Sequence, residues 1–201
     1  MISDKAGQYL VDLAKEAIKQ YLKTGEKIAK GEDYPIELDE KLGVFVTLNK
    51  NEELRGCIGY AEPIMSAIEA TIDVAIAASV NDPRFPKVTL DELENIDLEV
   101  TVLTKPEMII VAHYEQYFDE IEIGEDGLII QKGYSRGLLL PQVATENGFN
   151  VENFLEHTCM KAGIRFLPLD INKSEYKCTV ETEGIRLGFC CLANVSENAY
   201  D

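Results

Sequence analysis

Tryptophan is absent from the sequence, histidine occurs only twice, and basic side chains are few. The 201 residues hold 19 Lys and Arg against 36 Asp and Glu, which gives a formal net charge of −17. Such a chain repels polyanions unless its few cations are gathered in one place, so general nucleic-acid binding is disfavoured. A Cys-His hydrolase is also thinly supported, because His113 and His157 both lie far from Cys57 in the sequence and are interpreted as surface histidines.

The five cysteines show no pairing or metal-binding pattern. Cys57, Cys159, Cys178, Cys190 and Cys191 are odd in number and have no C-x-x-C spacing, which argues against both a disulfide framework and a zinc cage. The adjacent Cys190 and Cys191 would point to opposite faces of a strand. We therefore expect reduced thiols and no metal site.

Long hydrophobic runs are also missing. The most apolar segment, residues 64–80, is interrupted by Glu69 and Asp73. The N-terminal MISDKAGQYL has neither the basic start nor the apolar stretch of a signal peptide. No cofactor-binding motif is present in the sequence, so no cofactor is expected. We expect an acidic, cytoplasmic protein.

Apolar residues make up 46% of the chain, enough to fill a core. Their spacing predicts helices over residues 4–24, 63–80 and 151–163, a short helical turn at 89–92, and a helix that starts at Pro141. Alternation predicts strands over residues 43–49, 54–60, 96–103 and 176–181, with several short strands in 121–140. Because hairpins and helices follow no regular β-α-β order, we expect a single α+β domain over residues 1–201, with a mainly antiparallel sheet flanked by helices.

The segment ELRGCIGY, residues 53–60, is the first candidate site. In a regular strand Arg55, Cys57 and Gly59 project to one face, so the guanidinium would lie beside the thiol and favour the thiolate. Gly56 and Gly59 would let a ligand or another backbone approach closely. The alternative is that Cys57 is a small buried side chain and Arg55 pairs with a carboxylate. The glycines also permit a bulge that would break the alternation.

Two further segments have residues suited to ligand binding. Asp82 and Arg84 occupy a proline-restricted loop in NDPRFPKV, where they would either bind a ligand or staple the loop as an ion pair. In GYSRGLLLPQV, Arg136 lies between glycines and Gln142 lies just inside a predicted helix start, where free backbone amides hold anions. A plain tight turn explains this second segment equally well, since the spacing of a phosphate loop is absent.

A family resemblance joins these segments. LRGCIG, DPRF, GLLLPQVA and FLEHTCMKAG occur in this order, and together they resemble the AMMECR domain family, named for a human chromosomal region linked to Alport syndrome, midface hypoplasia and elliptocytosis. The resemblance covers nearly the whole chain and implies an archaeal or bacterial single-domain protein with a larger and a smaller lobe around a cleft. It supplies no established reaction. Family members occur beside Memo-like and radical S-adenosylmethionine proteins, which implies work in a shared pathway.

Two functional hypotheses follow for this chain. In the first, it is an enzyme or enzyme component that binds a small polar or anionic metabolite: Arg55 and Arg84 supply positive charge, Cys57 is a nucleophile or a close-packing wall, and Asp82 and Gln142 orient the ligand. In the second, it is a non-catalytic module that presents the LRGCIG hairpin to a partner protein. Nucleic-acid modification remains a third reading, on condition that the scarce basic residues cluster.

Overall fold

The computed structural model of the protein describes residues 2–112, 116–167, 170, 172–174, 179–180 and 184–186. The chain divides into two compact units, Met1–Glu107 and Met108–Asp201. The predicted α+β class and antiparallel pairing are confirmed within the units, since each contains helices and at least one antiparallel strand pair. Within the described residues, no helix combines the length and the apolar character that crossing a membrane requires.

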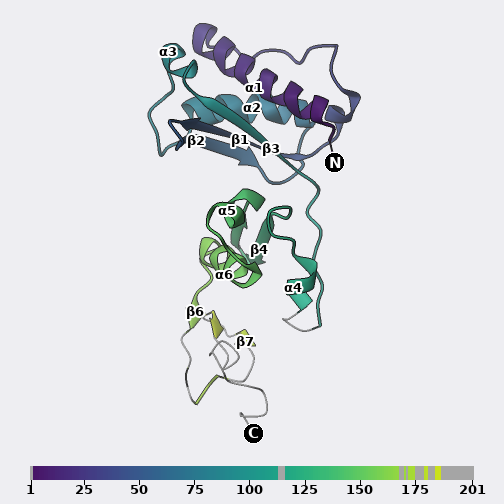
Figure 1. The fold of residues 1–201 in the computed structure, drawn as a ribbon, viewed down its shortest axis with the longest axis vertical. Helices are drawn as coiled ribbons and strands as arrows, with labels where there is room; N and C mark the ends of the chain where they lie inside the picture. The colour runs from purple at the N-terminus through teal and green to yellow at the C-terminus, as the bar shows by residue number, and fades with distance from the viewer. Residues whose placement is uncertain are drawn as a thin grey trace. The chain divides into compact units, whose positions relative to one another are not determined.

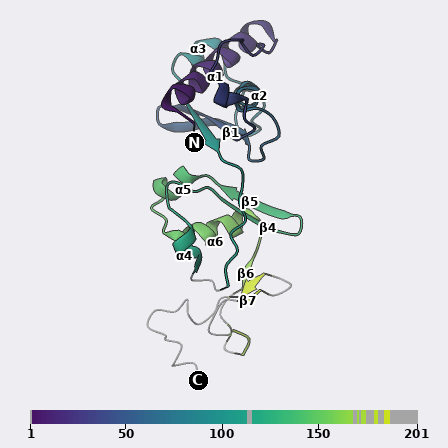
Figure 2. The ribbon, with the colours of Figure 1, turned by 90° about the vertical axis from the view of Figure 1, so that its right-hand side faces the viewer.

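The first unit is a three-stranded sheet with helices on one face (Figures 1 and 2). The strands run in the order β2-β1-β3, and both pairs are antiparallel. Alternate residues of the strands pack against α1 and α2 in one apolar core that includes Val44, Val46 and Leu48. The elements of this unit are α1 (Asp4–Thr24), η1 (Ile36–Asp39), β1 (Gly43–Lys50), β2 (Glu53–Tyr60), α2 (Ala67–Val80), α3 (Leu90–Leu93) and β3 (Asp97–Leu103).

Local capping explains where the helices of this unit begin. Ser3 and Thr89 accept hydrogen bonds from the third residue of α1 and α3 respectively, as their sequence positions predict. The prediction that Pro63 starts the next helix is wrong, because α2 begins at Ala67. Ser66 is the N-cap there, and its hydroxyl accepts from the backbone N–H of Glu69. Ile64, which the prediction placed inside this helix, precedes the cap and is exposed.

The β1-β2 hairpin contains a bulge. Asn51 and Glu52 form its turn with φ of 52° and 65°, and the pairing is regular from Lys50↔Glu53 to Asn49↔Leu54. The register then shifts by one, so Leu48 pairs with Gly56 and Arg55 is the extra residue. Beyond the bulge Thr47 lies opposite Cys57.

The second unit is built around a hairpin of β4 (Leu128–Lys132) and β5 (Ser135–Leu139). α6 (Val151–Lys161) packs on this hairpin, and Gly137 allows the contact because a Cβ there would lie 2.4 Å from the backbone nitrogen of Ala162. The remaining described elements are α4 (Tyr117–Glu120), α5 (Pro141–Glu146) and the two-residue strands β6 (Phe166–Leu167), β7 (Thr179–Val180) and β8 (Ile185–Arg186).

Two sequence predictions for this unit need comment. The start of the segment 121–140 is a turn instead of a strand, because the carboxylate of Asp126 accepts from the backbone N–H of Glu122 and the Asp126 N–H donates to the Glu122 carbonyl. Of the strand predicted over residues 176–181, only Thr179 and Val180 are described, as β7. The other four residues lie outside the described part of the chain.

Candidate functional site

The structure brings Cys57, Asp82 and Arg84 together at the edge of β2. The backbone N–H of Cys57 donates to Oδ2 of Asp82 at 2.9 Å, and Nη2 of Arg84 donates to the carbonyl oxygen of Cys57 at 3.1 Å. Asp82 and Arg84 therefore bind both backbone groups of one residue, as a neighbouring strand would. The NDPRFP loop is fixed to the hairpin by these two side chains.

Asp82 is the buried centre of this arrangement. It also accepts from the backbone N–H of Arg84 at 3.1 Å, from Nε at 2.9 Å and from Nη2 at 2.7 Å. These bonds, with the Arg84 guanidinium as the largest cause, hold the pKa of the Asp82 carboxyl far below its ordinary value. Only 2% of the Asp82 side chain is exposed, against 53% of the Arg84 side chain, so one end of the ion pair is buried and the other faces solvent.

The thiol of Cys57 has a hydroxyl neighbour that the sequence did not indicate. Oγ1 of Thr47 donates to Sγ of Cys57 at 3.3 Å across the hairpin, and the thiol is half-buried. The pKa of Arg84 is raised mainly by its bond to Asp82. The cation that contacts Cys57 is Arg84, through the backbone carbonyl.

Arg55 has a different partner. Its guanidinium makes a bidentate pair with Glu92 of α3, with Nε to Oε1 at 2.8 Å and Nη2 to Oε2 at 3.0 Å. Lys50 binds the same carboxylate at 3.0 Å. Arg55 is the principal cause that lowers the pKa of Glu92 to about 2. The pair ties the hairpin tip to α3, which is the ion-pair alternative recognised in the sequence.

The two glycines of the motif are required by packing. A Cβ on Gly56 would lie 2.4 Å from the carbonyl oxygen of Ala78, so the absence of a side chain lets α2 approach the sheet. A Cβ on Gly59 would lie 2.2 Å from the ring of Phe45, which covers this position. The prediction that Gly56 and Gly59 contact a ligand stays a prediction.

The other candidates lie in the second unit. Arg136 is on β5, opposite Gln131, and Gln142 is the second residue of α5. His157 is exposed on α6 and stacks on Phe149 with ring centroids 4.3 Å apart. His113, Cys178, Cys190 and Cys191 lie outside the described residues. Within the described ranges, no group of three or more His, Cys, Asp or Glu side chains is arranged to hold a metal ion.

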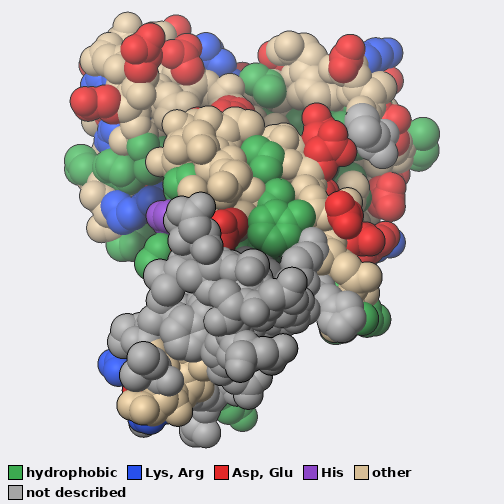
Figure 3. All heavy atoms as spheres, turned by 60° about the horizontal axis from the view of Figure 1, so that its bottom comes forward, with side chains coloured by type: hydrophobic (Ala, Val, Ile, Leu, Met, Phe, Trp, Pro, Cys, Tyr) green, Lys and Arg blue, Asp and Glu red, His purple; other side chains and the backbone are tan. Residues whose placement is uncertain are grey.

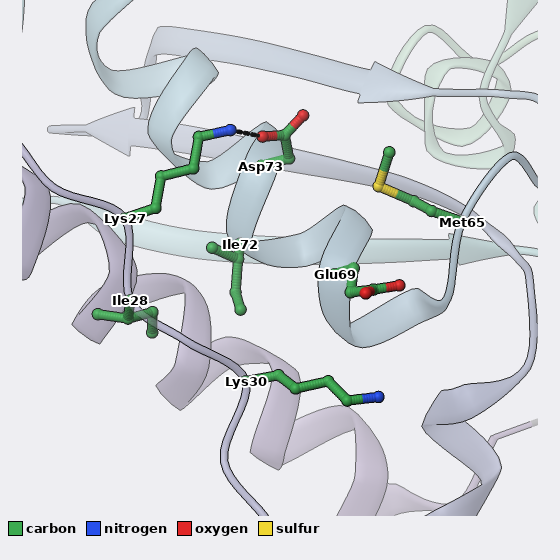
Figure 4. Close-up of a pocket in the computed structure, with 7 residues that line it drawn as sticks. All are labelled: Lys27, Ile28, Lys30, Met65, Glu69, Ile72 and Asp73. Atoms are coloured by element: carbon green, nitrogen blue, oxygen red, sulfur yellow. Dashed lines mark hydrogen bonds and ion pairs between the residues drawn. The ribbon is translucent and has the colours of Figure 1, made fainter.

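A surface hollow of about 400 Å³ lies between α2 and the segment after α1 (Figure 4). Its charged groups have partners within the first unit: Lys27 contacts Asp73, and Lys30 binds Asp39 at 3.1 Å. Tyr60 donates to Asp73 at 2.7 Å, which raises the pKa of the phenol. The hollow contains none of the residues that the sequence singled out.

Comparison with known proteins places the chain among archaeal relatives. The family model AMMECR1 matches residues 11–181, and a helix-hairpin-helix motif matches residues 163–201, few of which are described. Proteins of Pyrococcus furiosus and Pyrococcus horikoshii are each 50% identical over 189 residues, covering 90% of this chain and 88% and 90% of their own lengths. The crystal structure of an uncharacterized Pyrococcus horikoshii protein matches with a TM-score of 0.76 at 51% identity, covering 81% of this chain and 82% of that chain.

Proposed function

The chain belongs to the AMMECR1 family, and we propose that it is an enzyme or enzyme component that binds a small anionic metabolite at Cys57 and Arg84. The observation that carries the proposal is the half-exposed Arg84 guanidinium, held beside the Cys57 backbone by a buried carboxylate. Such a fixed cation binds carboxylate or phosphate without the entropic cost of ordering a free side chain.

Arg84 has binding capacity beyond its pairing with Asp82. The guanidinium carries five N–H groups, and the contacts with Asp82 and Cys57 engage Nε and Nη2. Because just over half of the Arg84 side chain is exposed, an anion reaches it without breaking the buried contacts. Arg55 is less suited to this role, since its side chain is mostly buried and its guanidinium already pairs with Glu92.

Cys57 is the reactive group that this proposal assigns. Its thiol accepts a hydrogen bond from the Thr47 hydroxyl, and the Arg84 guanidinium is held on the backbone carbonyl of the same residue. A hydroxyl donor and a nearby guanidinium both stabilise a thiolate relative to a thiol. A ligand anchored by its anionic group on Arg84 would therefore present its neighbouring carbon atoms to the sulfur.

Native alkylation with two reagents tests the proposal. Iodoacetate is anionic and iodoacetamide is neutral, so recruitment by Arg84 raises the iodoacetate-to-iodoacetamide rate ratio at Cys57, measured by peptide mass spectrometry. We expect Arg84→Gln to lower this ratio by about tenfold and the matched control Arg55→Gln to leave it unchanged. Arg84→Gln alone leaves the buried Asp82 carboxylate without its cation and could unfold the protein. The double variant Asp82→Asn/Arg84→Gln removes both charges, so it serves as the control for a loss of folding. Labelling of Cys57 only after unfolding, or one common ratio in all variants, would refute the proposal.

The rival function is a protein-interaction module that presents the hairpin. It is favoured by Leu54, a large apolar side chain that is 43% exposed next to the hairpin turn. The predicted association with Memo-like and radical S-adenosylmethionine proteins would supply such partners. Under this reading Leu54→Ser abolishes partner binding while Arg84→Gln does not, and the reverse result supports the ligand site.

A further inference from the structure

Thr47 and Cys57 form a side-chain pair across the β1-β2 hairpin. They lie directly opposite each other, and Oγ1 of Thr47 donates to Sγ of Cys57 at 3.3 Å. The backbone N–H and C=O of Cys57 point away from β1, because they bind Asp82 and Arg84. The pair is therefore of the non-hydrogen-bonded type, in which the side chains of two antiparallel strands come closest to each other.

The backbone of Thr47 is held on both sides. β1 is the central strand of its sheet, and Thr47 pairs with Cys57 of β2 and with Glu99 of β3. Threonine is β-branched, so its χ1 angle is restricted in a strand. The hydroxyl that contacts the thiol is therefore presented by a strand that is paired along both edges.

The bulge at Arg55 creates this pair. If the pairing of Asn49 with Leu54 continued without a bulge, Thr47 would lie opposite Gly56, which has no side chain to accept the hydroxyl proton. A shift of one residue would also turn the Cys57 side chain to the opposite face of the sheet. The contact between hydroxyl and thiol thus depends on the extra residue in β2.

A local donor matters at this thiol because the protein as a whole disfavours a further anion. The formal net charge is −17, and Figure 3 shows many acidic side chains among the described residues on one face of the molecule. A hydroxyl that donates to a thiolate makes a charge-assisted hydrogen bond, which is stronger than a bond between neutral groups. In this arrangement Thr47 keeps its own proton, and the proton that leaves Cys57 goes to solvent.

Thr47 and Arg84 contact different parts of Cys57. Arg84 binds the backbone carbonyl, whereas Thr47 binds the sulfur itself. We propose that Thr47 is the positioning residue of the Cys57 thiol: its hydroxyl aims Sγ and stabilises the thiolate, while Arg84 holds the anionic ligand. This inference rests on the proposed function, and it adds that the hydrogen bond at the sulfur and the charge that selects the ligand come from separate side chains.

Alkylation by neutral iodoacetamide at several pH values tests this role in the full chain. Each event forms a bond from Sγ to carbon and releases iodide, so the rate at Cys57 follows the amount of thiolate. We expect Thr47→Val to slow alkylation of Cys57 by about tenfold near neutral pH, and Thr47→Ser to keep the rate. Valine has the shape of threonine without the donor, so the comparison isolates the hydroxyl.

The same profile separates stabilisation of the thiolate from simple access. At about pH 10, above the free-thiol value of about 8.5, Thr47→Val should react at least as fast as the unchanged protein, because a thiolate without a hydrogen-bond donor is the stronger nucleophile. A variant that is slower at both pH values would show that Thr47 controls only access, and would overturn the proposal.

A second measurement needs no reagent. The carbon chemical shift of Cys57 Cβ follows the loss of the thiol proton, and its transition should move to higher pH in Thr47→Val but not in Thr47→Ser or in the control Arg55→Gln. A transition that is the same in all variants would overturn the role of Thr47, even where Arg84→Gln lowers the iodoacetate-to-iodoacetamide ratio. A moved transition with a ratio that is independent of Arg84 would support Thr47 and refute the ligand site, so the two proposals fail on different outcomes.

Discussion

Arg84 donates from Nη2 to the backbone carbonyl of Cys57, 27 positions earlier in the chain, while the Cys57 N–H donates to Asp82. Two side chains from one loop thus complete the hydrogen bonding of one strand residue. A buried aspartate with four donors around it is costly to leave half satisfied. The loop and the hairpin should therefore open together, as one unit in hydrogen exchange.

Asp82→Asn tests the contribution of the buried charge. The amide can still accept from Cys57, but it no longer neutralises Arg84, so we expect a loss of about 2–3 kcal/mol in the free energy of unfolding. Chemical denaturation measures this loss. The control is Asp33→Asn, on the exposed segment that follows α1, which should change stability by less than about 0.5 kcal/mol. Equal effects of the two variants would contradict a buried ion pair.

Stability should depend on pH in the acid range. The pKa values of Asp82 and Glu92 are both lowered in the folded state, that of Glu92 to about 2. Their stabilisation is complete above the unfolded-state values of about 4 and is lost as the pH falls toward the folded pKa values. Denaturation between about pH 5 and pH 2 should show this loss. Asp82→Asn/Glu92→Gln should flatten the curve, and an unchanged slope would exclude these two carboxylates as its cause.

Arg55→Gln should affect stability but leave the thiol environment unchanged. The variant removes two charge-assisted hydrogen bonds to Glu92, at an expected cost of about 1–3 kcal/mol. It should also shift the pKa of Glu92 upward, because the Arg55 hydrogen bonds that lower this pKa most are lost. NMR titration of the carboxylate measures this shift. Lys50 still binds Glu92, so a partial shift is expected. A slower alkylation of Cys57 in this variant would contradict the prediction and show that Arg55 influences the thiol.

Gly56→Ala and Gly7→Ala should have opposite signs. The new Cβ at position 56 meets the Ala78 carbonyl oxygen, so α2 must move away from the sheet, at a cost of about 1–3 kcal/mol. Gly7 lies within α1 and has open space around it, so alanine there should stabilise the helix by up to about 1 kcal/mol. Thermal denaturation compares the two variants. A neutral Gly56→Ala would mean that α2 is not held against β2.

Local chemistry made much of the first unit predictable. Ser3 and Thr89 each precede helical residues as caps, and the two predicted strands form the expected antiparallel hairpin, although the bulge at Arg55 breaks the alternation of the second strand. The helix start at Pro63 was predicted wrongly because Ser66, three residues later, supplies a side-chain acceptor that proline lacks. Helix and strand boundaries were therefore predicted correctly where one local sequence signal, such as a helix cap, had no competitor within a few residues.

The site itself depended on contacts that a single sequence does not encode locally. A regular two-residue turn would place Thr47 opposite Gly56, and only the bulge at Arg55 moves Cys57 into that position. The Arg55–Glu92 pair spans 37 positions, and nothing near Arg55 distinguishes Glu92 from the other 35 acidic residues. The one usable signal was the short helical turn predicted at 89–92, whose Glu92 side chain binds Arg55.

The bulge at Arg55 separates the hairpin into two independent modules. The turn at Asn51 and Glu52 determines pairing only as far as Leu54. Beyond Arg55 the phase of the strand is set by Gly56 against Ala78 and by Asp82 at Cys57. The tip can therefore be exchanged or lengthened by residue pairs while Cys57 keeps Thr47 as its partner, which makes it a natural insertion point for a spectroscopic reporter.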